Sequence, residues 1–200
     1  SLSDLVDGVV PEYKVYVMIN TLEIDAEEKA AIDKHLKKDG KIVLWQWLAG
    51  ASNRKEISAK NMSEVIGMDV KFDTSELVLN TIITNKDHWL TKGVDDTIGS
   101  GLGYRVASPV AIITDNDANV TKLGHLYDGK TMSSLAVMEN ENWTSIFSSV
   151  PGYNVKMFKN VLKKAGVHMY SDNLNDVIYA NTNYVGINAA YGGEKVLKLP

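Results

Sequence analysis

The fold is decided by one stretch, Asp25-Ala-Glu-Glu-Lys-Ala-Ala-Ile-Asp-Lys-His-Leu-Lys-Lys-Asp-Gly-Lys-Ile-Val-Leu-Trp-Gln-Trp-Leu48, which predicts a helix followed directly by a buried strand. Asp25 is expected to cap the helix, and Glu28, three residues later, completes a capping-box pattern. Lysines gather toward the end of the helix, as the helix dipole favours. Gly40 can adopt the left-handed conformation that ends a helix. The run from Ile42 to Leu48 is almost continuously apolar, as in a strand covered on both faces.

A second short apolar run, Lys14-Val-Tyr-Val-Met-Ile19, precedes the helix. A strand, a helix and a strand at this spacing predict a βαβ unit. We therefore expect Val15–Ile19 to pair in parallel with Ile42–Leu48, with the helix 25–38 crossing between them. In that strand, Trp45 and Trp47 would share one face and form core.

The rest of the chain has mostly the periodicity of strands. We expect a short helix beginning after Ser58, β-rich residues at 68–84, strands at 110–114, 120–127, 134–138 and 143–150, an amphipathic helix between Pro151 and Gly166, and a β-rich tail at 167–200. Asp128-Gly129 marks a tight hairpin turn. The pattern predicts an α/β fold with a parallel central sheet and antiparallel β additions.

Composition excludes several classes of function. Hydrophobic and charged residues make up 44% and 23% of the 200 residues, as in ordinary globular proteins. The net charge of −4 gives no basic field for nucleic acid, and no apolar run is long enough to span a membrane. The chain has no cysteine, which excludes disulfides, thiolate metal sites and a cysteine nucleophile. None of these features identifies a cellular compartment.

Three stretches together resemble a known family: Tyr13–Leu44, then Ala165-Gly-Val-His-Met-Tyr170, then Val177–Asn188 with Gly193-Glu-Lys-Val-Leu-Lys-Leu-Pro200. Their order and spacing are similar to the trimerisation domain of bacterial β-galactosidases of glycoside hydrolase family forty-two. The resemblance implies a three-layer, flavodoxin-like fold of the class I glutamine amidotransferase type. It also implies that the domain is non-catalytic and helps to assemble a trimer.

In that family the domain follows a (β/α)₈ barrel that carries the catalytic carboxylates. The resemblance implies that the first strand and helix of the domain are absent from this chain, and that a small β-domain follows Pro200. We therefore expect residues 1–200 to be a single α/β domain and a fragment of a longer polypeptide.

Candidate catalytic groups are few. Amidotransferase chemistry needs a cysteine on a strand-to-helix elbow, so it is excluded here. Ser52, in the loop Gly50–Asn53, is the nearest substitute, but the second glycine of a Gly-x-Ser-x-Gly elbow is missing. This loop follows the central strand at the sheet edge where α/β proteins usually bind ligands, so a hydrolase site there is an alternative.

Metal and cofactor signals are weak. The four histidines, His35, His88, His125 and His168, have no metal-ligand spacing. The acid pairs Glu139/Glu141 and Asp95/Asp96 lie in expected turns, and Asp115-Asn-Asp117 lacks the remaining features of a calcium loop. The glycine-rich run Gly99–Gly103 lacks the strand and helix of a phosphate-binding loop. We expect no metal and no cofactor.

The expected interface or ligand surface consists of Trp89 and Trp143, in the loops 86–103 and 139–143, and of Tyr104, directly after the first loop. Aromatic residues are enriched in interfaces and ligand sites; the alternative is that these side chains fold back onto their own sheet as core. The leading hypothesis is a non-catalytic oligomerisation domain of a glycosidase-related protein of carbohydrate metabolism. A carbohydrate-binding module that uses Trp89 or Trp143 is the second alternative.

Overall fold

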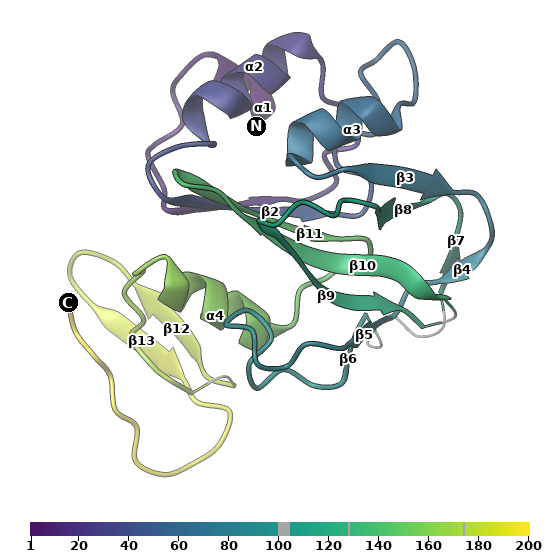
Figure 1. Ribbon diagram of the computed structural model, residues 1–200. Coiled ribbons are helices and arrows are strands. Elements are labelled where there is room, and N and C mark those ends of the chain that lie inside the picture. The colour runs from purple at the N-terminus through teal and green to yellow at the C-terminus, as the bar shows by residue number, and fades with distance from the viewer. Residues whose placement is uncertain (100–104, 128, 174) are drawn as a thin grey trace.

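The computed structural model describes residues 1–99, 105–127, 129–173 and 175–200, and shows a mixed α/β fold (Figure 1). The helices are α1 (Leu2–Val6), α2 (Ala26–His35), α3 (Ala59–Ile66) and α4 (Val155–Lys164). The strands are β1 (Val15–Met18), β2 (Lys41–Gln46), β3 (Val70–Asp73), β4 (Leu77–Val78), β5 (Thr81–Ile83), β6 (Thr97–Ile98), β7 (Val106–Ala107), β8 (Val110–Ile113), β9 (Val120–Leu126), β10 (Gly129–Glu139), β11 (Trp143–Ser148), β12 (Val177–Ala180) and β13 (Val185–Asn188).

The predicted βαβ unit is present. β1 pairs in parallel with β2, Val15 opposite Ile42 and Met18 opposite Trp45, and α2 connects them. The Asp25 carboxylate accepts the N–H groups of Glu27 and Glu28 at 3.0 Å, and Glu28 accepts the Asp25 N–H at 3.0 Å, so the capping box forms as expected. The expected end of the helix was wrong: α2 ends at His35 with Leu36 as its C-cap, and Gly40, although left-handed with φ +70°, lies in the turn before β2 and does not cap the helix.

The largest sheet of the described residues has the order β1-β2-β11-β10-β9-β5-β6, with β8 attached to β10 and β3 attached to β8. Strand β11 pairs in parallel with β2, Trp143 opposite Lys41 and Ser148 opposite Gln46. The pairs β10–β11, β9–β10 and β5–β9 are antiparallel. The sheet is therefore mixed, with a three-stranded parallel part at one end and antiparallel strands beyond it.

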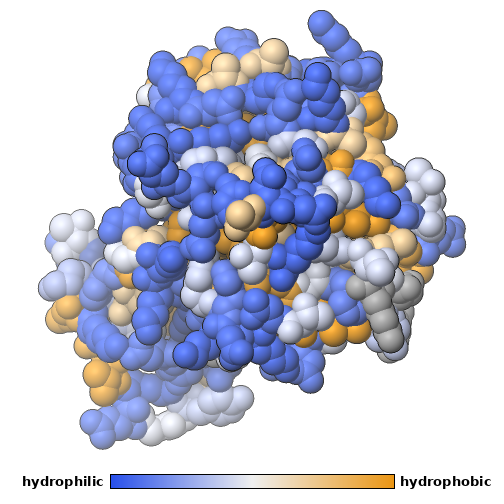
Figure 2. Space-filling model, in the orientation of Figure 1, coloured by the Kyte–Doolittle hydropathy of each residue, from blue (hydrophilic) through white to orange (hydrophobic). Residues whose placement is uncertain are grey.

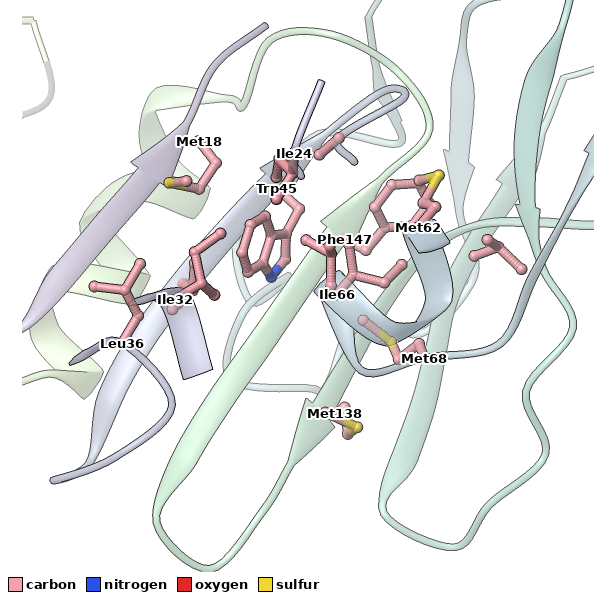
Figure 3. Close-up of a cluster of buried hydrophobic side chains, with 14 of the residues drawn as sticks. Met18, Ile24, Ile32, Leu36, Trp45, Met62, Ile66, Met68, Met138 and Phe147 are labelled. Atoms are coloured by element: carbon pink, nitrogen blue, oxygen red, sulfur yellow. The ribbon is translucent and has the colours of Figure 1, made fainter. Parts of the chain in front are cut away.

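Helices lie on both faces of this sheet (Figure 1). On one face, α2 and α3 bury Ile32, Met62 and Ile66 against Trp45 and Phe147 (Figure 3), and α1 adds Leu5 to the same core. On the other face, α4 buries Met157 and Val161, and the loop before β6 buries Leu90 and Val94, against Ile42, Leu44 and Ile146. Successive residues of β2 thus enter different cores, which explains its continuous apolar sequence.

The expectation for Trp47 was wrong. β2 ends at Gln46, and Trp47 lies in the following turn with φ +56° instead of continuing the strand beside Trp45. The left-handed conformation is unfavourable for a bulky residue such as tryptophan. The apolar pattern of the strand therefore predicted that Trp47 would continue it. Trp45 is fully buried, as expected.

A buried hydrogen-bond chain connects three elements of the first core. The indole N–H of Trp45 in β2 donates to Ser145 Oγ in β11 at 3.0 Å, and the Ser145 hydroxyl donates to the Ile66 carbonyl of α3 at 2.6 Å. A buried polar group without a partner costs about 1–3 kcal/mol. Ser145 therefore keeps the Trp45 indole satisfied inside an apolar core.

Replacing Ser145 by alanine should lower the free energy of unfolding by about 1–3 kcal/mol, because the Trp45 indole N–H loses its acceptor. Urea denaturation measures the loss. In a double-mutant cycle, Trp45→Phe and Ser145→Ala together should cost less than the sum of the single substitutions. Strictly additive losses would show that the two side chains are not coupled.

Candidate functional site

The expected loops meet at one corner of the molecule. The Trp89 indole N–H donates to Glu139 Oε1 at 3.2 Å, and the same oxygen lies 3.2 Å from the Lys164 ammonium. The Lys164 Nζ also lies 5.2 Å from the centroid of the Trp89 ring, which is a cation–π distance. Three segments thus converge: the loop before β6, the end of β10 and the last turn of α4.

This corner lies at the amino ends of the parallel strands. Glu139 ends β10 opposite Thr144, near the start of β11, which begins beside the first residue of β2. Ligands of open α/β sheets usually bind at the opposite, carboxyl edge. Trp89 therefore lies at the edge of the sheet opposite to the one where ligands usually bind.

Trp143 belongs to the other side of the sheet. Its ring packs against the core beneath α2 and α3, with Lys37 Nζ 5.3 Å from the ring centroid, whereas Trp89 packs against the core beneath α4. The two tryptophans share an edge of the sheet and not a surface. Tyr104 lies outside the described residues.

A groove of about 480 Å³ adjoins Trp89. Its lining is formed by Trp89, Lys92 and Gly93 of the loop and by Lys156, Asn160, Lys163 and Lys164 of α4. The Asn160 amide donates to the carbonyls of Leu90 and Lys92, each at 3.0 Å, and fixes the loop to the helix. The lysines were visible in the sequence, but their position beside Trp89 depends on this tertiary contact.

His88 stands next to Trp89, with the ring centroids 5.3 Å apart. Its Nδ1 accepts the Leu90 N–H at 3.3 Å, which requires an unprotonated nitrogen. Burial lowers the pKa of His88 below its ordinary value of 6.5; the charge of Lys164 acts in the same direction, and that of Glu139 opposes both. The corner therefore favours a neutral His88.

The alternative site at the carboxyl edge has a different character. The Ser52 Oγ accepts the Arg54 N–H at 3.1 Å, and Ser52 pairs through its backbone with Glu23 and Ile57. Among the described residues, no histidine or carboxylate hydrogen-bonds to the Ser52 hydroxyl. Ser52 therefore lacks the neighbouring base that activates a serine nucleophile.

A second groove of about 480 Å³ lies beside this loop, and two of its four acidic lining residues, Asp25 and Glu64, form ion pairs. The Arg54 guanidinium lies 3.1 Å from Asp25 and 2.8 Å from Glu28, the two residues of the α2 capping box. Glu64 pairs with Lys29. These contacts give Asp25, Glu28 and Glu64 basic partners that hold structure, not the paired carboxylates of a glycosidase.

The remaining candidates are scattered. In the part of the chain that the structure describes, no three His, Asp or Glu side chains form a group that could hold a metal ion. His125 contacts the Leu126 carbonyl, and His168 contacts the Lys198 carbonyl. Asp115 accepts the backbone N–H groups of Asp69 and Asp117. None of the described helices has the length and hydropathy needed to cross a membrane.

Comparison with known proteins gives a relation of fold. No family model matches the chain, and no curated protein matches it. Among solved structures, a ThuA-like protein from Bacteroides uniformis ATCC 8492 is similar, with a TM-score of 0.54 and 14% identity over 82% of this chain and 74% of that chain. Gan42B, a GH42 β-galactosidase from G. stearothermophilus, matches with a TM-score of 0.46 and 10% identity over 78% of this chain and 22% of that chain. The first similarity supports the mixed α/β fold alone, and the second is too weak to carry an argument.

The charges around His88 make its titration a test of this geometry. Glu139→Gln should lower the pKa of His88 further, because it removes a negative charge that raises this pKa. Lys164→Met should raise the pKa, because it removes a positive charge that lowers it. NMR titration of the imidazole measures both shifts. Glu141→Gln, in the same turn, is the matched control and should leave the pKa unchanged. Equal shifts for Glu139→Gln and Glu141→Gln would contradict the described contact.

The same lowered pKa has a consequence for stability. The contribution of His88 is full above its unfolded pKa and is lost as the pH falls from about 6.5 through the folded pKa, because the unfolded chain takes up the proton first. His88→Gln should therefore flatten the decline of the unfolding free energy on this acidic side.

Proposed function

We propose that this chain is a non-catalytic assembly domain of a larger, glycosidase-related protein, with the three-layer flavodoxin-like arrangement of the class I glutamine amidotransferases. The observation that carries the proposal is that two uncharged strand edges pair with no other strand of the described residues. One edge is β1, at the end of the large sheet, and the other belongs to the hairpin of β12 and β13. An uncovered edge is a template for pairing with another polypeptide.

The β1 edge is defined by its register. The Ile42 N–H donates to the Lys14 carbonyl at 2.9 Å, so the backbone groups of Lys14, Tyr16 and Met18 point toward β2. Those of Val15 and Val17 then point outward. Within the described residues they have no hydrogen-bond partner, and β1 contains no charged side chain that would oppose pairing.

The hairpin edge follows from the same reasoning. The Asn181 N–H donates to the Tyr184 carbonyl, and alternation along the antiparallel pair leaves the backbone groups of Val185 and Ile187 pointing away from β12. Residues 177–193 contain no charged side chain. Tyr179 and Tyr184 are 61% and 65% exposed. In Figure 2 apolar surface is visible over this end of the molecule.

Two different open edges suit a closed ring of identical subunits. A cyclic trimer needs a heterologous contact, in which one patch of a subunit meets another patch of the next. We infer that the hairpin of one copy adds to β1 of the next copy. Because both edges are uncharged, identical chains can approach without like-charge repulsion. An isolated two-stranded hairpin is marginally stable, so pairing would also stabilise it.

Sedimentation tests this assembly. The chain should form trimers at micromolar concentration, and the double substitution Tyr179→Lys/Tyr184→Lys should give monomers, because charged side chains oppose edge pairing. The matched control is Ile57→Lys, at an apolar position that is 74% exposed and outside both edges; it should leave the trimer intact. A monomeric wild-type chain would refute self-assembly, and a trimer unaffected by the double substitution would refute the hairpin as its surface.

The proposal also predicts that the chain is inactive toward glutamine and glycosides. Glutaminase chemistry of the amidotransferase type lacks its cysteine, and Glu139 is held by Trp89 and Lys164. Assays with glutamine and an aryl galactoside check this prediction. Turnover of the galactoside by pure protein that is lost in Glu139→Gln or Glu141→Gln would make the chain an enzyme.

A further inference from the structure

The groove beside Trp89, lined by lysines from α4 and the adjoining loop, has an unusual charge for this chain. The whole molecule is acidic, with a net charge of −4, yet four lysines and no carboxylate line this groove. Glu139 offsets one of them, Lys164. For Lys92, Lys156 and Lys163 no ion pair is formed among the described residues. In Figure 2 the surface over α4 is strongly hydrophilic.

The groove has a fixed wall and floor. Trp89 is held by the Glu139 carboxylate at 3.2 Å and by Lys164, so its ring needs no reordering to receive a ligand. Asn160 uses both of its amide hydrogens to hold the loop, and its carbonyl oxygen has no partner within the described part of the chain. That oxygen can accept a hydrogen bond from a hydroxyl group.

Gly93 contributes to the shape of the groove. A Cβ at this position would lie 3.1 Å from Lys156 Cε, and the glycine φ of +73° is one that other residues rarely adopt. The glycine therefore lets the Lys156 side chain pass close to the loop. The volume of about 480 Å³ is within the usual range for small-ligand sites.

We propose that this groove binds a short acidic oligosaccharide whose carboxylates pair with Lys92, Lys156 and Lys163. A sugar ring would pack against Trp89, and its hydroxyl groups would meet the Asn160 carbonyl. The combination of a fixed aromatic ring, a hydroxyl acceptor and unpaired cations favours a uronic acid over a purely inorganic anion. This binding does not depend on the assembly proposed above, because the strand edges and the groove share no residue.

Titration of the full chain with trigalacturonate, followed by Trp fluorescence and calorimetry, tests the site. Trigalacturonate should bind at least tenfold more tightly than galactotriose, its neutral counterpart. Each Lys→Met substitution at 156 or 163 should weaken binding roughly two- to fivefold, the range of an exposed ion pair. Lys34→Met, at an exposed position on α2, is the matched control and should have no effect.

Further measurements keep the proposal falsifiable. Trp89→Phe, which preserves an aromatic ring, should weaken binding while circular dichroism shows an unchanged fold. Triglutamate tests for a generic attraction to anions. Equal binding of triglutamate and trigalacturonate, equal binding of galactotriose, or no binding of trigalacturonate at millimolar concentration would each overturn the acidic-sugar site.

Discussion

The structure depends on the burial of β2. This strand has a parallel neighbour on each side and an apolar core on each face, so every group of its backbone and side chains must be satisfied by the protein. Trp45 is the largest of these side chains, and its indole N–H is satisfied through Ser145 and the end of α3. The Tyr153 hydroxyl donates to the Trp45 carbonyl at 2.7 Å, which connects the segment before α4 to the same residue. The two helical layers are thus coupled through one strand.

Local contacts explain what could be predicted from the sequence. The unit β1–α2–β2 is continuous in the chain, and its caps, apolar runs and terminal glycine all indicate the same structure. The place of β11 beside β2 could not be predicted in this way, because Ser145 and Trp45 are 100 residues apart. Trp47 shows a second limit: its strained turn depends on tertiary contacts that override the pattern of the strand.

At the candidate site, too, local features were predictable from the sequence and tertiary contacts were not. The sequence placed Trp89 in a loop, but its partners Glu139 and Lys164 come from separate elements. Side chains alternate along β11, so Trp143 packs in the core beneath α2 and α3, and Ile146 packs in the core beneath α4. Trp89 and Trp143, two tryptophans near loops in the sequence, therefore lie on opposite faces of the sheet. Only the pairing of strands decides which aromatic residue adjoins the lysines of α4.

The distribution of charge separates the two surfaces. The open strand edges are apolar and uncharged, which permits close approach of backbone to backbone, as a β-pairing contact requires. The groove is lined by four lysines, and covering it with a dry protein contact would cost the desolvation of their charges. Because α4 buries Met157 and Val161 in the core while its lysines face the groove, the helix can present this charge without weakening the fold. Assembly and ligand binding would therefore depend on different residues, so a substitution that abolishes one would leave the other intact.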